Sequence, residues 1–304
     1  MAQGLPVKNA EQHWAVWDST RLNNFPFRDD DIIIGTWSKS GTTWTQQLVA
    51  QLVFRGDPEA YGQMLSPWPE FRIAPLEAAY EQAEAQTHRR FIKTHSPFNC
   101  VPYHESIKYL FIGRDARDVV WSMFNHHEIM NPEAFHLFND APGRVGPPWT
   151  HEIRDVHQFY LKFLEQGYMP GHTPDTNFWN CICQWWQVRD LPNVKLVHYN
   201  NLKQDFVGEA KKIADFLDIE IEESLWPQIE KHCSIDYMRD LSAKFEDLHI
   251  IFNGGGQNFI NKGTNGRWKD VLSQEEVDRC DAIAIQEIGA QCAHWLKTGE
   301  IPPG

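Results

Sequence analysis

The chain has 304 residues, enough for one large α/β domain or two small ones. Its residues are 42% hydrophobic and include 13 tryptophans, which can fill a core and still line a pocket for an apolar ligand. The net charge of −13 argues against general binding to nucleic acid or to an anionic membrane. A polyanionic ligand would therefore have to be held by a local cluster of cations and N–H groups.

The cysteines show neither C-x-x-C pairs nor regular spacing; they stand at positions 100, 181, 183, 233, 280 and 292. This distribution predicts reduced thiols in a cytosolic protein, not a zinc site or a disulfide framework. Residues 1–14 lack a basic region followed by an apolar run, and no apolar stretch approaches the length of a membrane span. We therefore expect a cytoplasmic protein without a membrane span.

Apolar runs that suit strands alternate with helical patterns along the chain. Strands are predicted at 32–35, 91–93, 109–113 and 194–198, and helices at about 42–54, 115–127, 153–166, 177–189, 206–217 and 274–295. This alternation favours an α/β fold with a central parallel sheet flanked by helices. Loops are predicted at about 56–72, 130–150, 167–176 and 254–256. Nothing marks a domain boundary, so we expect one domain over residues 1–304.

The segment 31–44, DIIIGTWSKSGTTW, has the pattern of a buried strand, an anion-binding turn and a helix. The turn supplies small residues, hydroxyls and one lysine where free N–H groups meet the positive end of the helix dipole. It is not a Walker A loop, because Ser40 stands where the second glycine belongs and Lys39 precedes Gly41. The pattern predicts a phosphate or sulfate site and disfavours ordinary ATPases and GTPases.

The second predicted strand ends in a polar turn, Lys93-Thr94-His95-Ser96. A surface or core position is the simpler interpretation for most of the 14 histidines. His95 differs because it follows the carboxyl end of a strand, beside Lys93. A neutral imidazole there can take a proton from a hydroxyl group.

The third predicted strand is followed by Arg114, and Ser122 comes about two helical turns later. A guanidinium and a hydroxyl at one sheet edge can clamp a phosphate. For this segment taken alone, a capped amphipathic helix with the arginine paired to Asp115 or Asp118 is the better explanation.

A glycine-rich segment, residues 259–269, carries Asn261, Lys262 and Gly263. By itself it would be interpreted as a surface loop. Its lysine and backbone N–H groups could nevertheless contact a phosphate.

Together, over about residues 30–296, these segments resemble motifs of the cytosolic-type sulfotransferases, and we expect a bacterial member. Residues Lys39 to Trp44 match six consecutive positions of T-Y-P-K-S-G-T-T-W. The second turn is similar to K-T-H-L-P, and Arg114 and Ser122 match the 3′-phosphate motif. The last segment is similar to R-K-G-x-x-G-D-W-K, with Asn261 in place of the arginine.

The resemblance implies transfer of a sulfuryl group from 3′-phosphoadenosine 5′-phosphosulfate (PAPS) to a hydroxyl of a small acceptor, without a metal. It implies that His95 is the general base, that Lys39 offsets charge on the leaving oxygen and that Lys93 supports the sulfuryl group. The nucleotide would be held by Lys39, Ser40, Gly41, Thr42, Thr43, Trp44, Arg114, Ser122, Tyr199, Ser234, Asn261, Lys262 and Gly263.

Two alternatives remain: an ATP-dependent, P-loop kinase-like phosphotransferase, and a non-catalytic module that binds adenosine 3′,5′-bisphosphate (PAP). The position of Lys39 and the 3′-phosphate motif weigh against the first. The presence of both His95 and Lys39 weighs against the second. If His95 is not the base, His104, His126 and His127 are the candidates.

Segments 56–85, 128–176 and 240–260 are expected to form the acceptor pocket. They supply the aromatic residues Tyr61, Trp68, Phe71, Tyr80, Phe135, Phe138, Trp149, Tyr168, Phe245 and Phe252 and few cations. This composition favours an uncharged, mainly apolar acceptor of lipid, sterol, phenol or polyketide type over a polyanionic polysaccharide.

The segment Lys269–Asp278 departs from K-x-x-x-T-V-x-x-x-E, the family's dimer motif, with Gln274 at the position of the valine. Because such a small interface depends on a few apolar residues, we expect a monomer or a dimer formed through another surface.

Overall fold

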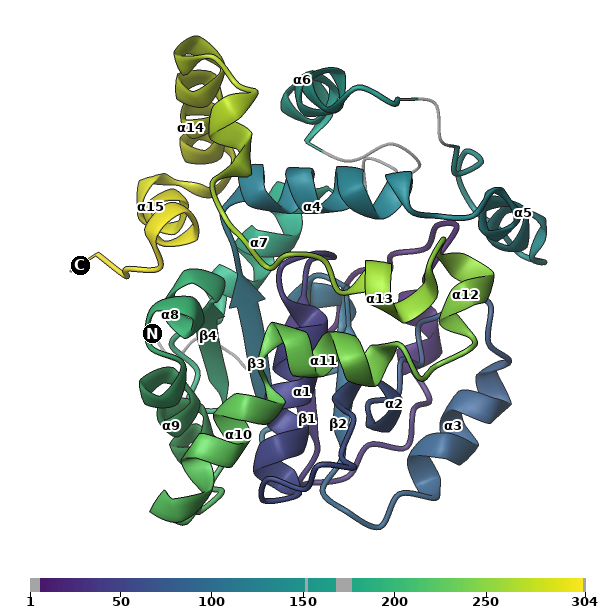
Figure 1. The fold of residues 1–304 in the computed structure, drawn as a ribbon, viewed down its shortest axis with the longest axis vertical. Coiled ribbons are helices and arrows are strands. Elements are labelled where there is room, and N and C mark those ends of the chain that lie inside the picture. Colours follow the sequence, from purple (N-terminus) through teal and green to yellow (C-terminus); the bar gives the residue numbers. More distant parts are fainter. Residues whose placement is uncertain (1–5, 151–152, 168–176, 303–304) are drawn as a thin grey trace.

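In a computed structural model, which describes residues 6–150, 153–167 and 177–302, four parallel strands form a sheet in the order β2-β1-β3-β4 (Figure 1). The strands are β1 (Ile32–Thr36), β2 (Phe91–Thr94), β3 (Lys108–Gly113) and β4 (Val194–His198). In the central register Ile33 of β1 lies opposite Ile92 and Tyr109. All four predicted strands are confirmed, and the sheet belongs to a single α/β domain.

Helices surround this sheet. They are α1 (Thr42–Val53), α2 (Gly62–Leu65), α3 (Leu76–Glu84), α4 (Ala116–Glu128), α5 (Pro132–Asp140), α6 (Val156–Gln166), α7 (Phe178–Gln187), α8 (Tyr199–Gln204), α9 (Phe206–Phe216), α10 (Trp226–His232), α11 (Ile235–Ser242), α12 (Leu248–Ile251), α13 (Gly255–Phe259), α14 (Gln274–Ile288) and α15 (Ala290–Thr298).

Alternating side chains of the strands enter two different cores, one on each face of the sheet. Ile32 and Ile34 pack with apolar residues of α1, α9 and α10. Ile33 and Phe111 face the other side, where α4, α6, α7, α14 and α15 supply the core. The period-two pattern of buried strands therefore sets both layers.

Two glycines at the carboxyl ends of strands let tryptophans lie directly against the sheet. A Cβ atom on Gly35 would come within 2.3 Å of the Trp185 ring, and one on Gly113 within 2.4 Å of the Trp295 ring. Several of the 13 tryptophans are thus core residues.

At the opposite end of the sheet, Arg90 and Asp31 form a bidentate ion pair with N–O distances of 2.5 and 2.7 Å. Both side chains are fully buried, just before β2 and β1. The pair ties the starts of the two strands together. Among the described residues no helix has the length and apolar character needed to cross a bilayer.

The prediction of one continuous helix at 274–295 is wrong. The segment divides into α14 and α15 at Gly289, whose φ of 77° lies in the left-handed region. Helices α2, α5 and α13 also lie within or overlap segments predicted as loops, and residues 168–176 fall outside the described part of the chain.

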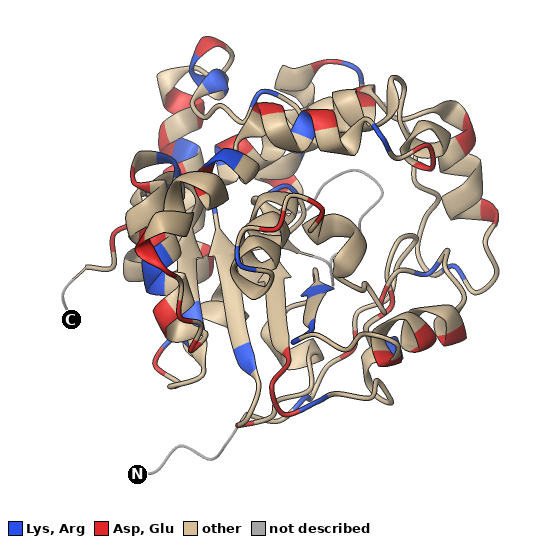
Figure 2. Cartoon of the chain, turned by 60° about the horizontal axis from the view of Figure 1, so that its bottom comes forward, with Lys and Arg blue, Asp and Glu red and all other residues tan. Residues whose placement is uncertain are grey.

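Acidic residues are distributed over the outer helices and loops (Figure 2). The glutamates of α3, Glu77, Glu81 and Glu84, are exposed examples. The residues that give the chain its negative net charge therefore lie largely on the outside of the molecule. The charged groups at the carboxyl end of the sheet are a different set.

Candidate active site

A cavity of about 690 Å³ lies at the carboxyl ends of the four strands. Its wall includes the turn after β1, Lys93 and His95 at the end of β2, Arg114 after β3 and Tyr199 after β4. Helix α4 and the segment α11–α13 complete the wall, and Figure 1 shows the latter crossing in front of α1. This is the position at which parallel α/β sheets bind ligands.

The turn between β1 and α1 has the shape of an anion site. Gly41 is the N-cap of α1 with a φ of 116°, and a Cβ atom there would lie 2.8 Å from the Tyr199 ring. Because glycine has no side chain to cap the helix, the N–H groups of the first turn are left for a ligand. Ser40 is fully buried, and its hydroxyl has no hydrogen-bond partner among the described residues. An unsatisfied polar group in such a turn fits a phosphate site.

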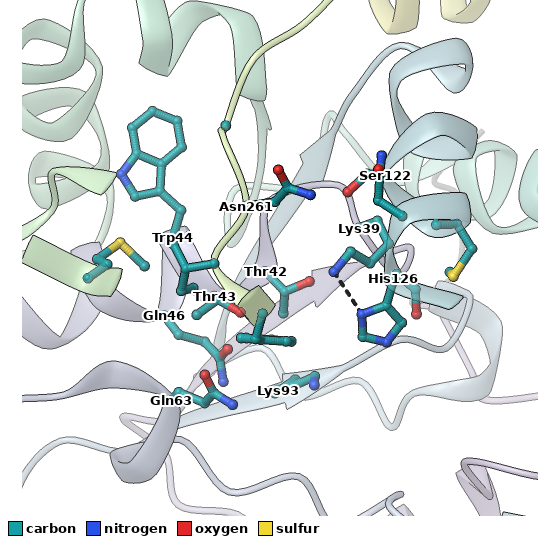
Figure 3. A pocket seen from close by; sticks show the side chains of 18 of the residues that line it. Lys39, Thr42, Thr43, Trp44, Gln46, Gln63, Lys93, Ser122, His126 and Asn261 are labelled. Carbon is teal, nitrogen blue, oxygen red and sulfur yellow. Dashed lines mark hydrogen bonds between the residues drawn. The ribbon is translucent and has the colours of Figure 1, made fainter. Parts of the chain in front are cut away.

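Two lysines bring desolvated ammonium groups into the cavity (Figure 3). Lys39 Nζ lies 3.2 Å from His126 Nδ1 and 5.1 Å from the centre of the Phe259 ring. Burial of the ammonium, with repulsion from Arg114, lowers the pKa of Lys39 to about 8. Lys93 Nζ lies 3.6 Å from the centre of a Trp68 ring, and burial lowers its pKa to about 7.

His126 is the acceptor in the contact with Lys39. Burial, followed by repulsion from Lys39, holds the pKa of His126 well below its usual value. A neutral ring can accept a hydrogen bond from the ammonium at Nδ1. Of the three alternative bases, His126 lines the cavity and His104 and His127 do not. His127 instead accepts a hydrogen bond from Trp149 Nε1 at 3.1 Å.

His95 is held by the end of β1. Its Nδ1 lies 2.8 Å from the Thr36 carbonyl oxygen, which can only accept, so Nδ1 carries the proton and Nε2 the lone pair. The rings of Trp17 and Trp68 lie 5.5 and 5.1 Å from the imidazole. The tautomer set by this contact is the one that a general base needs.

Glu70, which the sequence analysis did not identify, supports the turn that contains His95. Its carboxylate accepts hydrogen bonds from the His95 backbone N–H and from Trp68 Nε1, both at 3.2 Å, and from the Ser96 hydroxyl. Burial raises the pKa of Glu70, and these hydrogen bonds oppose the rise. No sequence spacing links Glu70 to a residue 25 positions away, so only the fold shows this contact.

The end of the cavity at which the nucleotide was predicted is built around Tyr199. The Arg114 guanidinium lies 4.3 Å from the centre of that ring and donates to Asn265 Oδ1 and to the Lys39 carbonyl oxygen. The Tyr199 hydroxyl donates to the carbonyl oxygen of Gly263 at 3.2 Å. These bonds join the turn after β1, the end of β3 and the glycine-rich segment into one wall.

An aromatic slot adjoins this wall. The Trp44 ring stacks on Phe206 at 5.9 Å and 20°, and its Nε1 donates to the Cys233 carbonyl oxygen at 2.9 Å. Phe206 is a second residue that the sequence analysis did not identify. Both rings line the cavity and offer an aromatic surface to a planar base.

The structure brings nearly all the predicted site residues to this one cavity. Ser40 lies beneath the turn and is not part of the cavity wall; the others line it, namely Lys39, Gly41, Thr42, Thr43, Trp44, Lys93, His95, Arg114, Ser122, Tyr199, Ser234, Asn261, Lys262 and Gly263. Ser234 also caps α11 through a hydrogen bond from the Tyr237 N–H.

The aromatic residues predicted for the acceptor pocket divide into two groups. Cavity-lining members are Trp68, Phe71, Phe138, Trp149 and Phe252. The prediction is wrong for Tyr61 and Phe245, which stack on each other, for Tyr80, which packs on Phe25, and for Phe135, which packs on Trp149. Tyr168 lies outside the described residues.

The segment before β1 also lines the part of the cavity predicted for the acceptor, which the sequence analysis did not foresee. Trp14, Val16 and Trp17 line the cavity, and Trp17 forms a bridge with Phe71. The closely spaced tryptophans of WAVWD were a signal, but they precede the region of family resemblance.

Comparison with known proteins assigns this arrangement to a family. A family model described as "Sulfotransferase domain" matches residues 29–290. A glycolipid sulfotransferase from Mycobacterium bovis is 30% identical over 280 residues, which cover 85% of each chain. This relative is bacterial, in line with the expected source.

Solved structures agree on the fold. A retinol dehydratase in complex with androsterone and PAP has a TM-score of 0.70 at 22% identity, over 90% of this chain and 85% of that chain. A mouse sulfotransferase in complex with PAP has a TM-score of 0.67 at 22% identity, over 91% of this chain and 90% of that chain. With a family match over most of its length, this chain belongs to the sulfotransferase family and is a sulfotransferase enzyme.

Proposed function

We propose that this sulfotransferase takes its sulfuryl group from PAPS and transfers it to a hydroxyl of a small, mainly apolar acceptor. The observation that carries the proposal is the meeting, in one cavity, of an anion-binding turn, two desolvated lysines and His95 in the tautomer of a base. Family membership weighs against the kinase alternative and against a non-catalytic module.

The cavity has matching groups for each part of the donor. The N–H groups of Gly41, Thr42 and Thr43 would hold the 5′-phosphate. Arg114, Ser122 and Lys262 would hold the 3′-phosphate, with Asn261 as a neutral contact. The aromatic surface of Trp44 and Phe206 would contact the adenine. When bound, PAPS supplies the sulfuryl group and leaves as PAP.

In the proposed reaction His95 takes the hydroxyl proton at Nε2 as the acceptor oxygen forms its bond to sulfur. The bond between sulfur and the 5′-phosphate oxygen breaks at the same time. Lys39 stabilises the charge that develops on this leaving oxygen, and Lys93 holds the oxygens of the moving group. The lysines supply the positive charge, so we propose that no metal is required.

The aromatic and aliphatic side chains that line the cavity are an argument for an apolar acceptor. A largely apolar part of the cavity wall includes Trp14, Trp17, Phe138 and Trp149. Among the described lining residues Glu230 is the single acidic one. The name of the mycobacterial relative, glycolipid sulfotransferase, is in keeping with such an acceptor. We propose a lipid, sterol, phenol or polyketide alcohol.

Further parts of the proposal are one domain over residues 1–304, a cytoplasmic location, and a monomer or a dimer formed through a surface other than Lys269–Asp278. In that segment Ser273 caps α14 in a capping box with Glu276, and Gln274 is exposed. This use of the segment in the fold supports a role other than dimerisation.

The test is turnover of purified protein with ³⁵S-labelled PAPS and a panel of apolar alcohols and phenols, with EDTA present. We expect labelled sulfate ester, formed about 10²–10⁴-fold more slowly by a His95→Ala control. Transfer from γ-labelled ATP in place of PAPS, or a requirement for divalent metal, would contradict the proposal.

A further inference from the structure

Two uncharged amide side chains lie in the cavity wall beside Lys93. Gln46 comes from α1 and Gln63 from α2, and Figure 3 shows both near Lys93, below Thr43. The two helices touch closely here: a Cβ atom on Gly62 would lie 2.2 Å from the Gln46 carbonyl oxygen. The Gly62 N–H also donates to Gln47 Oε1 at 2.9 Å. These contacts hold α1 and α2 together and so place both side chains next to the proposed transfer centre.

The Gln46 amide is available to a ligand. Gln46 is only 2% exposed, it lines the cavity, and its amide makes no hydrogen bond to any described residue. Gln47, its neighbour, donates to the Ala60 carbonyl oxygen and so serves the fold. The Gln63 Oε1 accepts from the Tyr61 hydroxyl at 2.9 Å, and the half-buried Gln63 side chain lines the cavity. Behind them the Ser66 hydroxyl is buried with no partner among the described residues.

A buried amide without a protein partner is unfavourable, so a ligand or water must complete the hydrogen bonds of Gln46 in the working enzyme. An amide offers both a donor and an acceptor, which suits a hydroxyl group better than an anion. The phosphates of the donor have closer cationic and N–H partners at the turn after β1 and at Arg114. The apolar wall on the other side of His95 offers no comparable amide pair among its described residues.

We infer that Gln46 and Gln63 form a subsite for a second hydroxyl of the acceptor, next to the hydroxyl that is sulfated. This inference rests on the proposed function. It narrows the acceptor class to amphipathic compounds, with an apolar body against the tryptophan and phenylalanine side chains and a diol or polyol head group at Lys93. Because the two amides are uncharged and can each donate and accept, they suit a neutral hydroxyl beside Lys93.

The experiment compares dodecan-1-ol with dodecane-1,2-diol in the wild-type protein and in Gln46→Leu and the Gln46→Leu/Gln63→Leu double variant. We expect kcat/KM to be about tenfold higher for the diol in the wild type. One lost neutral hydrogen bond corresponds to about 3–10-fold, so the diol-to-alcohol ratio should fall by that factor in Gln46→Leu and approach one in the double variant. The exposed Gln286→Leu on α14 is the matched control and should keep the wild-type ratio.

A diol-to-alcohol ratio of kcat/KM near one in the wild type would overturn the inference. An equal loss of kcat/KM for both acceptors in the variants would also overturn it, because the amides would then act on the donor or on the fold. Calorimetric titration of both compounds into the wild-type protein saturated with PAP gives the same comparison without a variant. Turnover of the alcohol without preference for the diol refutes only the subsite. Absence of sulfate transfer to every acceptor refutes the proposed function as well.

Discussion

Lys39 should make nucleotide binding depend on pH in a range where ordinary lysines do not titrate. Its pKa is lowered to about 8, mainly by burial. The phosphates of bound PAP favour the charged form, so binding should be coupled to proton uptake. With that pKa the charged fraction in the free protein falls from about nine-tenths at pH 7 to about one-tenth at pH 9, and the Kd for PAP should rise about tenfold.

Three other buried titratable groups at this end of the cavity, His126, Tyr199 and Cys233, stay neutral over this range. Burial holds the pKa of His126 far below it and raises the pKa of Tyr199 and of Cys233. Lys93, whose pKa is about 7, is assigned to the sulfuryl group, which PAP lacks. PAP therefore reports on Lys39 more directly than PAPS does.

Isothermal titration calorimetry in two buffers of different ionisation enthalpy measures both the Kd and the protons taken up. About half a proton should be taken up at pH 8 in the wild type. Lys39→Arg is the control, because a guanidinium stays charged throughout and should flatten the pH dependence. A Kd that is constant within twofold from pH 7 to 9, with no proton uptake, would refute the assignment of Lys39 to the phosphate.

Three substitutions test the remaining parts of the site. His95→Ala should lower kcat by about 10²–10⁴-fold in steady-state assays while calorimetry shows a nearly unchanged Kd for PAP; a normal kcat would place the base elsewhere. Arg114→Ala should reduce the preference for PAP over adenosine 5′-phosphate by about 10–100-fold, because charge-assisted hydrogen bonds to the 3′-phosphate are lost, and an unchanged preference would contradict that contact. Glu70→Ala should lower the free energy of unfolding by about 1–3 kcal/mol in urea titrations, since it leaves the Ser96 hydroxyl and the His95 N–H unpaired, whereas Glu70→Gln should recover part of the loss.

The parts of the molecule that sequence predicts well are those fixed by local pattern. Each strand is a short apolar run bounded by turn residues, and the turn after β1 combines glycine, hydroxyls and lysine within a few positions. The break at Gly289 was not predicted, because apolar residues continue on both sides of a single glycine. Helix α5 was not predicted, because its nine residues lie within a segment whose prolines and glycines are typical of a loop.

Contacts between distant segments account for the other differences. Glu70 and Trp17 reach His95 only because the fold brings three separate segments together. The acceptor aromatics show the same limit: Phe252 and Phe245 stand in one predicted segment, yet Phe252 lines the cavity and Phe245 stacks on Tyr61. Their chemistry is identical, so the direction of each ring depends on tertiary packing, which no pattern of a single segment contains.

The burial of two lysines in the cavity explains how they could bind an anion and assist the reaction. Burial lowers the pKa of Lys39 and of Lys93, so the charged form of each is unfavourable in the free protein. The exposed carboxylates of helices such as α3 do little to compensate, because salt screens them over distances beyond about 8 Å. An anion bound within the cavity would supply counter-charge to Lys39 and add to the attraction that Lys93 already has from Glu70. The same low-dielectric surroundings then strengthen the attraction between the lysines and charge that develops on a leaving oxygen. A solvent-exposed pair of lysines would keep ordinary pKa values and lose that advantage, which is a physical reason to place the cations among tryptophan and phenylalanine rings.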